Sequence, residues 1–165
     1  LAGTHARDKD AVVASMLICE MAAYYKSQGK TLIDVMNGLY DEFGYYCNTV
    51  QSYTFEGAAG MEKMAAIMDG LRDNKPSSFA GYEVTKIDDY KTSKSTIVKT
   101  GEESEITLPK SNVLAYTLTN GNKVIVRPSG TEPKIKAYIT AIGQSEENAK
   151  EIAQKLLDDA NELMK

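Results

Sequence analysis

Charged and hydroxyl-bearing residues gather around one short turn, in the segment VIVRPSGTEPKIKAY at residues 124–138. Pro128 and Pro133 stiffen the two shoulders of the turn PSGTEP, and Gly130 allows positive φ or the close approach of a ligand. Successive backbone N–H groups in such a turn can form an anion-binding nest. The side chains of Ser129 and Thr131 add hydroxyl donors, so the segment has the composition of a phosphate cradle.

The cations flanking this turn suit a phosphate ligand. Arg127 carries a planar fork that matches two phosphate oxygens at once. Lys134 and Lys136 are two residues apart on an expected strand, so both point to one face while Ile135 points to the other. Glu132 could repel an anion, or it could hold a neighbouring lysine or the amides of the turn. The alternative interpretation is a rigid hairpin with ordinary solvated lysines, and the spacing does not fit a P-loop for nucleotide triphosphates.

Composition limits the function classes. The 165 residues carry a formal charge of -4 with 42% hydrophobic and 25% charged residues, so there is no general basic field and nucleic acid is not an expected partner. The apolar run at residues 11–19 is too short for a membrane span. His5 is the single histidine, which leaves a zinc site short of ligands. Cys19 and Cys47 lack a CxxC pattern, which favours reduced packing thiols in a cytoplasmic protein.

The elements that must position the turn form an α+β pattern. Apolar periodicity predicts helices at residues 7–26, 31–43, 58–72 and from 145 onward, and strands at 45–56, 82–87, 112–119, 123–127 and 134–142. Thr31 and Asp34 form a capping box at the second helix, and Asn120-Gly121 predicts a hairpin. Residues 88–111 are expected to form a polar loop or ragged hairpin. The fold class is therefore an antiparallel four- to five-stranded sheet with two helices on one face, preceded by a helical pair.

The helical pair at residues 1–44 lacks a sheet of its own, and its first helix is apolar on most sides, as in a helix buried within a larger body. We therefore expect two parts, a helical remnant of a preceding domain at residues 1–44 and a C-terminal domain at residues 45–165. The sequence begins without methionine and without a signal-peptide pattern. We expect it to be a piece of a longer protein.

Two segments carry a resemblance to a known family. RPSGTEPKIKAY at residues 127–138 resembles the phosphate-binding loop in the C-terminal domain of the α-D-phosphohexomutases, the phosphoglucomutase and phosphomannomutase family. GTHARDKDAVVAS at residues 3–15 resembles the segment after the sugar-reading loop in the third domain of that family's bacterial phosphoglucomutases. The resemblance implies that residues 1–44 are the helical remnant of the third, sugar-reading domain and that residues 45–165 are the C-terminal phosphate-binding domain.

The resemblance also implies a role in catalysis. In this family a phosphoserine donates its phosphoryl group to a hexose phosphate, and a bisphosphate intermediate turns over in the site. The C-terminal domain grips the phosphate that is not being transferred. Magnesium and glucose 1,6-bisphosphate are the implied cofactors of the complete enzyme, but the nucleophile, the metal loop and the sugar-reading loop have no match here. The chain alone is expected to be inactive, to bind no metal, and to act with the missing N-terminal domains on a hexose phosphate.

Individual residues follow from the matched motifs. The resemblance implies that Arg127, Ser129, Gly130 and Thr131 hold the phosphate, with Lys136 as a further cationic contact. Lys9 resembles an active-site lysine that faces the substrate, and its alternative is a local ion pair with Asp8 or Asp10. His5 is interpreted as structural.

Two other functions stay open at this point. One is a free-standing anion-binding or scaffold module without mutase activity. The other is a structural or dimer-forming domain, suggested by aromatic residues in one expected strand, namely Tyr45, Tyr46, Tyr53 and Phe55. The sugar preference depends on a loop that this chain lacks.

Overall fold

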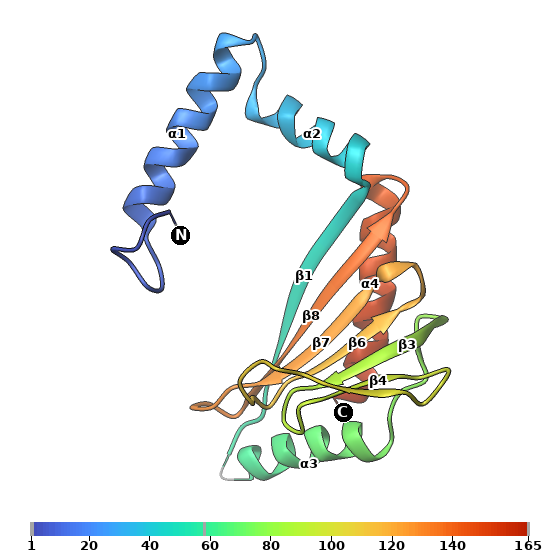
Figure 1. The fold of residues 1–165 in the computed structure, drawn as a ribbon. Coiled ribbons are helices and arrows are strands. Elements are labelled where there is room, and N and C mark those ends of the chain that lie inside the picture. Colours follow the sequence, from blue (N-terminus) through green and yellow to red (C-terminus); the bar gives the residue numbers. More distant parts are fainter. Residues whose placement is uncertain (1, 58, 165) are drawn as a thin grey trace. The chain divides into compact units, whose positions relative to one another are not determined.

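The structure is a computed structural model that describes residues 2–57 and 59–164. It forms two compact units, Leu1–Gly44 and Tyr45–Lys165, and each unit is described by itself (Figure 1).

The first unit consists of α1 (Ala11–Ser27) and α2 (Leu32–Phe43). Helix α1 begins at Ala11 instead of at the predicted Arg7, because the Asp10 side chain caps it by accepting a hydrogen bond from the Val13 N–H at 3.0 Å.

The capping box predicted for the second helix is confirmed. The Thr31 N–H donates to Asp34 Oδ2 at 2.8 Å, and the Asp34 N–H donates to Thr31 Oγ1 at 3.1 Å. Hydrogen bonds from Thr31 lower the pKa of Asp34, so the carboxylate form is favoured and the cap is strengthened.

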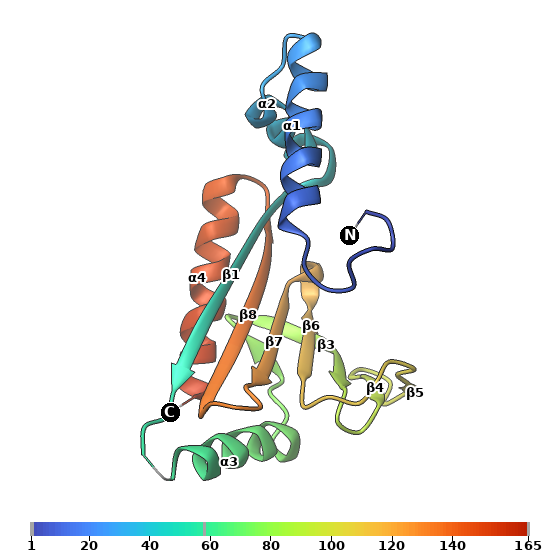
Figure 2. The same ribbon diagram turned by 90° about the vertical axis from the view of Figure 1, so that its left-hand side faces the viewer.

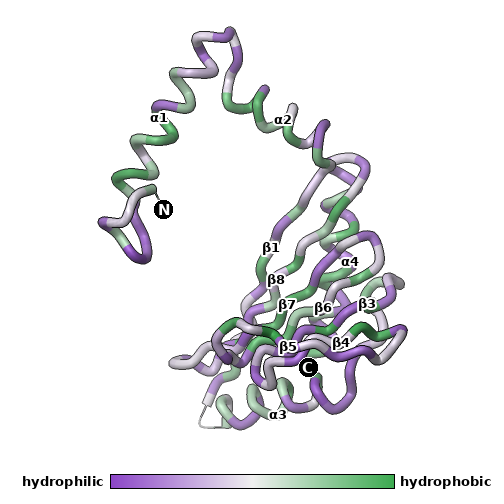
Figure 3. Tube along the Cα trace, in the orientation of Figure 1, coloured by the Kyte–Doolittle hydropathy of each residue, from purple (hydrophilic) through white to green (hydrophobic). Residues whose placement is uncertain are grey.

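The two helices expose much of their apolar surface. No residue of α1 or α2 is buried within the described chain, so the apolar sides of the first helix, which the sequence predicts to be buried within a larger body, are uncovered in this chain. Hydrophobic stretches are visible on both helices in Figure 3. The large apolar side chains concerned are Val12, Met16, Leu17, Ile18, Met21, Tyr24, Ile33, Met36, Leu39 and Phe43. Phe43, for example, is 62% exposed.

The second unit is built on an antiparallel sheet. Its strands are β1 (Tyr45–Thr54), β2 (Ser78–Phe79), β3 (Tyr82–Asp89), β4 (Lys94–Ile97), β5 (Glu103–Glu105), β6 (Leu114–Leu118), β7 (Lys123–Pro128) and β8 (Lys134–Gly143). Among the described residues the strand order is β1-β8-β7-β6-β3-β4-β5, with β2 paired to β3. The five longer predicted strands are present, and the polar excursion adds the short hairpin of β4 and β5.

Helix α4 (Glu146–Leu163) covers one face of this sheet, as Figure 2 shows, and α3 (Gly60–Asp73) lies at one end of the strands and adds buried residues to the same core. Alternate strand residues and the apolar stripes of both helices meet in one core, which includes Met68, Tyr116, Ile135 and Leu156. The predicted fold class is confirmed. The opposite face of the sheet carries the other alternate residues, and we call it the open face.

The hairpin predicted at Asn120-Gly121 joins β6 to β7. Asn120 has φ 66° and Gly121 has φ 78°, and both angles match the two positive values that a tight type I′ turn requires. A second glycine, Gly143 at the end of β8, allows the close packing of β8 against α4. A Cβ on Gly143 would lie 2.4 Å from the Ala149 nitrogen, so only glycine lets the two backbones approach this closely.

Both cysteines are free. Cys47 packs against the core as predicted, whereas Cys19 is exposed on α1. No helix in the described part of the chain is long and apolar enough to cross a membrane.

Candidate anion-binding site

The turn PSGTEP at residues 128–133 joins the neighbouring antiparallel strands β7 and β8. Arg127 of β7 lies opposite Lys136 of β8, and Pro128 lies opposite Ile135. The Ser129 N–H donates to the Lys134 carbonyl at 2.7 Å and closes the turn. The fixed register brings the two halves of the motif together, as the sequence predicts.

The turn is also anchored to the rest of the unit. The Pro133 carbonyl accepts a hydrogen bond from the Phe55 N–H at 2.9 Å, immediately after β1. Pro133, at one shoulder of the turn, is therefore held against the end of β1, the strand that borders β8.

Inside the turn, two successive backbone amides converge on one oxygen. The N–H groups of Thr131 and Glu132 donate to Ser129 Oγ at 3.4 and 3.3 Å. Both bonds are long for hydrogen bonds of this type, and convergence of neighbouring amides is the geometry of an anion nest. When the hydroxyl oxygen accepts from both amides, its own hydrogen remains available for a ligand.

Gly130 lies in open space at the tip of the turn. A Cβ at this position would meet nothing within 4 Å, which leaves room for a ligand. Gly130 is not among the glycines with positive φ. The hydrogen bonds to Ser129 close the turn without a left-handed residue at this position.

Glu132 is held by a lysine. Its carboxylate lies 3.2 Å from Lys134 Nζ, one of the two alternatives open from the sequence. This ion pair occupies Lys134 and leaves the other two cations of the motif unneutralised.

Arg127 and Lys136 lie side by side on the open face. Their strand neighbours Val126, Ile135 and Ala137 are buried on the helix-covered face, and both cations are exposed. Neither side chain has an ion pair or hydrogen bond to any other described residue. Like charges directly opposite on neighbouring strands destabilise a sheet, so this pair is expected to favour a bound anion.

The structure tests the alternative for Lys9 in the first unit. Within residues 2–57 and 59–164, Lys9 makes no ion pair with Asp8 or Asp10. Asp10 instead caps α1 and lies 2.7 Å from His5 Nε2, which agrees with a structural role for His5. Lys9 lines a groove of about 600 Å³ together with Asp10, Val13 and Leu17.

The aromatic residues of β1, together with Phe55, which follows it, divide between the two faces. Phe55 is buried in the core, and the Tyr53 hydroxyl donates to Asn161 Oδ1 at 2.6 Å. Burial raises the pKa of Tyr53. Tyr46 is 43% exposed on the open face. Two of the four aromatic residues, Tyr53 and Phe55, therefore serve packing.

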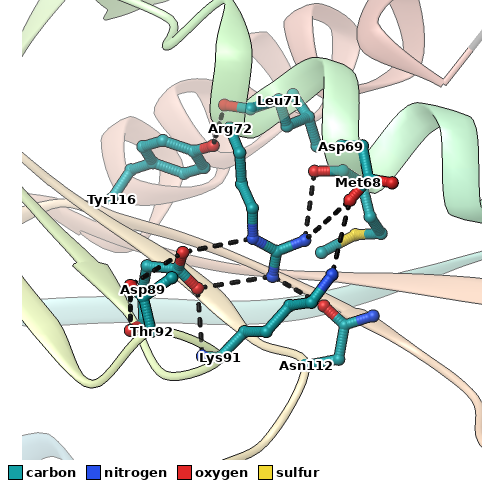
Figure 4. Close-up of polar contacts among 9 residues, drawn as sticks. All are labelled: Met68, Asp69, Leu71, Arg72, Asp89, Lys91, Thr92, Asn112 and Tyr116. Carbon is teal, nitrogen blue, oxygen red and sulfur yellow. Dashed lines mark hydrogen bonds and ion pairs between the residues drawn. The ribbon is translucent and has the colours of Figure 1, made fainter.

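A second polar cluster lies on the other side of the sheet (Figure 4). Arg72 of α3 donates through Nε and Nη2 to the two carboxylate oxygens of Asp89 at 3.1 and 3.3 Å, and to Asn112 Oδ1 at 2.6 Å. Burial tends to raise the pKa of Asp89, but hydrogen bonds from Arg72, the Lys91 N–H and Thr92 bring it below its usual value.

This second cluster is internally satisfied. Arg72 also donates to the Met68 carbonyl, and the Tyr116 hydroxyl donates to the Leu71 carbonyl at 3.4 Å. Burial strongly raises the pKa of Tyr116. The sequence gives no signal for this pairing, since its members are far apart along the chain. The cluster fastens α3 to the sheet and offers no free cation to a ligand.

Comparison with known proteins indicates the family of the chain. Residues 62–159 match the family model described as phosphoglucomutase/phosphomannomutase, C-terminal domain. Phosphoglucomutase of Staphylococcus haemolyticus is 39% identical over 140 residues, which cover 85% of this chain and 25% of the relative. Phosphoglucomutase of Staphylococcus epidermidis strain RP62A is 38% identical over 158 residues, covering 96% of this chain and 28% of the relative.

The fold is shared with a solved structure. The open form of parafusin from Paramecium, an exocytosis-sensitive phosphoprotein and phosphoglucomutase, aligns with a TM-score of 0.61 and 15% identity. The alignment covers 97% of this chain and 28% of parafusin. The chain thus spans about a quarter of the length of the relatives it matches. It belongs to the phosphoglucomutase/phosphomannomutase family and contains that family's C-terminal domain.

Proposed function

We propose that residues 45–165 grip the phosphate group of a hexose phosphate that is not being transferred, within a complete phosphohexomutase. The observation that carries this proposal is the cationic pair of Arg127 and Lys136, directly opposite in register and without partners in the described chain. A phosphate monoester carries about -1.5 to -2 charges near pH 7. Such a dianion would relieve the repulsion between the two cations and satisfy their donors.

The turn adds donors to these charges. The hydroxyl of Ser129 and the tip formed by Gly130 and Thr131 border the cationic pair, and the open space around Gly130 lets a ligand approach the backbone. Because Glu132 is paired with Lys134 at 3.2 Å, its negative charge does not neutralise the cationic pair of Arg127 and Lys136. Phosphoryl transfer depends mainly on positioning and charge stabilisation, so this grip contributes to the reaction as well as to binding.

The first unit supplies the second part of the proposal. Residues 1–44 are assigned to the helical end of the sugar-reading domain, because α1 and α2 expose apolar residues such as Val12, Ile33 and Phe43. A stable protein covers surface of this kind. Lys9 has no partner in the described chain and is assigned as the lysine that faces the substrate.

The complete enzyme would interconvert hexose 1-phosphate and hexose 6-phosphate through a bisphosphate, as the phosphoglucomutase relatives suggest by name. Magnesium is the implied metal of such an enzyme. Residues 2–57 and 59–164 contain no group of three potential metal ligands, so no step through a metal is assigned to this chain. The chain alone is proposed to be inactive, and the proposed location is the cytoplasm.

The test is kinetic and uses the complete enzyme that the proposal implies. Arg127→Ala removes a charged, forked contact, which should lower kcat/KM for glucose 1-phosphate by roughly ten- to a hundredfold. Lys123→Ala is the matched control, because Lys123 is an exposed cation on the same strand and face. Unchanged kcat/KM in the Arg127 variant would refute the assignment.

A further inference from the structure

The cationic pair belongs to a longer row across the open face. Strand β8 lies between β7 and β1, so Lys136 has a register partner on each side. Arg127 is its partner on β7, and Ser52 is its partner on β1. We infer that Ser52 is a further ligand of the same anion, an inference that rests on the proposed function.

The geometry supports a shared ligand. Directly opposite residues in an antiparallel pair share one face of the sheet, with Cβ atoms about 4.5–5.5 Å apart. Ser52 therefore stands beside Lys136, and roughly 10 Å of sheet separates the backbones of Ser52 and Arg127. The long stem of Arg127 can lean across that distance over Lys136, whereas the short serine contributes its hydroxyl close to the sheet.

The hydroxyl of Ser52 is available. Ser52 is exposed, and within the described chain its side chain makes no hydrogen bond. Its carbonyl is the group that accepts from Gln51 Nε2, at 3.2 Å. The row thus presents a hydroxyl, an ammonium and a guanidinium from three adjacent strands, and none of them has an acceptor among residues 2–57 and 59–164.

The neighbouring rows of the open face lack this combination. Thr54 lies opposite Lys134, and that lysine is already paired with Glu132. On the other side, Val50 lies opposite Tyr138 in an apolar row.

In the next row, beyond Val50 and Tyr138, the side chains of Asn48 and Thr140 are already bonded to each other. Thr140 donates to Asn48 Oδ1 at 2.8 Å, so these two side chains satisfy each other. That row also holds the exposed Lys123, which lies on β7 opposite Thr140, but the side chain of Asn48 is already engaged. Among the described residues, Ser52 is therefore the side-chain donor of β1 that lies directly opposite an unpaired cation. By this inference, the anion binds to three strands and links β1 to the turn.

The experiment is an NMR titration of the 165-residue chain with inorganic phosphate at constant ionic strength. Ser52→Ala should raise the dissociation constant about three- to tenfold, the effect of one hydrogen bond. Ser52→Thr keeps the hydroxyl and should bind like the wild type. Ser95→Ala removes an equivalent hydroxyl from β4, opposite Asp88, and should leave binding unchanged.

The variant Arg127→Ala distinguishes a failure of the role of Ser52 from a failure of the anion site itself. If this variant loses binding while Ser52→Ala binds like the wild type, the anion site stands and the role of Ser52 is wrong. If wild-type chain shows no phosphate binding, or Arg127→Ala binds as tightly as wild type, both the proposed function and the role of Ser52 are overturned.

Discussion

Replacing Lys136 by glutamate should stabilise the chain without an anion and remove its response to phosphate. In the wild type, Lys136 faces Arg127 across the β7–β8 pair. Two unit charges roughly 6 Å apart in water repel each other by about 0.7 kcal/mol. Glutamate would turn this repulsion into an attraction, so the unfolding free energy should rise by about 1 kcal/mol, near the upper range for cross-strand charge pairs.

Phosphate should reverse the order of stability. A ligand that binds only the folded state stabilises it by RT ln(1 + [L]/Kd), which is about 1.4 kcal/mol at ten times Kd. The wild type should gain this amount and overtake the variant, which has lost one cation and gained a carboxylate beside the site. Urea unfolding followed by circular dichroism, with and without phosphate at constant ionic strength, measures both effects.

The matched control is Lys123→Glu. Lys123 is exposed on the neighbouring strand β7, and its register partners are the neutral Thr140 and Thr117. This variant should stay within about 0.5 kcal/mol of the wild type and keep its response to phosphate. Equal stabilisation of wild type and Lys136→Glu by phosphate would refute the anion site, and a less stable Lys136→Glu variant would refute the repulsion.

Two further predictions concern the packing that supports the site. Arg72→Leu should cost about 1–3 kcal/mol in urea unfolding, because it leaves the half-buried Asp89 carboxylate without its main partner, and adding Asp89→Asn should recover part of the loss. The pKa of Asp89 is lowered in the fold, so the stabilisation by its carboxylate is present above about pH 4 and is lost as pH falls through the folded pKa. The cost of Arg72→Leu should therefore shrink at low pH. A cost that does not depend on pH would contradict this role of the ion pair. Gly143→Ala should cost about 1–3 kcal/mol, since its Cβ would lie 2.4 Å from the Ala149 nitrogen, whereas Gly130→Ala meets nothing within 4 Å and should be neutral in the same assay.

Local features of the fold could be predicted from the sequence. The capping box at Thr31 and the hairpin at Asn120-Gly121 depend on residues close together in the chain, and both are confirmed. The β7–β8 turn belongs to the same class. Its short connection places Arg127 opposite Lys136 once the two strands are recognised.

Contacts between distant segments could not be predicted in this way. The pairing of Ser52 with Lys136 depends on the register between the first and last strands, which no short motif records. The ion pair of Arg72 with Asp89 depends on how α3 packs against β3. The φ of Gly130 could not be predicted either, because glycine permits positive φ without requiring it.

The most direct measurement is to map the amide shifts of this chain during titration with glucose 1-phosphate and glucose 6-phosphate, with inorganic phosphate as the reference ligand. The predicted result is that all three ligands shift the amides of residues 127–136, with a smaller response at Ser52 on the neighbouring strand. Chloride at the same ionic strength should leave these amides unchanged. Shifts located elsewhere, or no shifts at millimolar ligand, would contradict a phosphate grip built by Arg127, Lys136 and the turn between them.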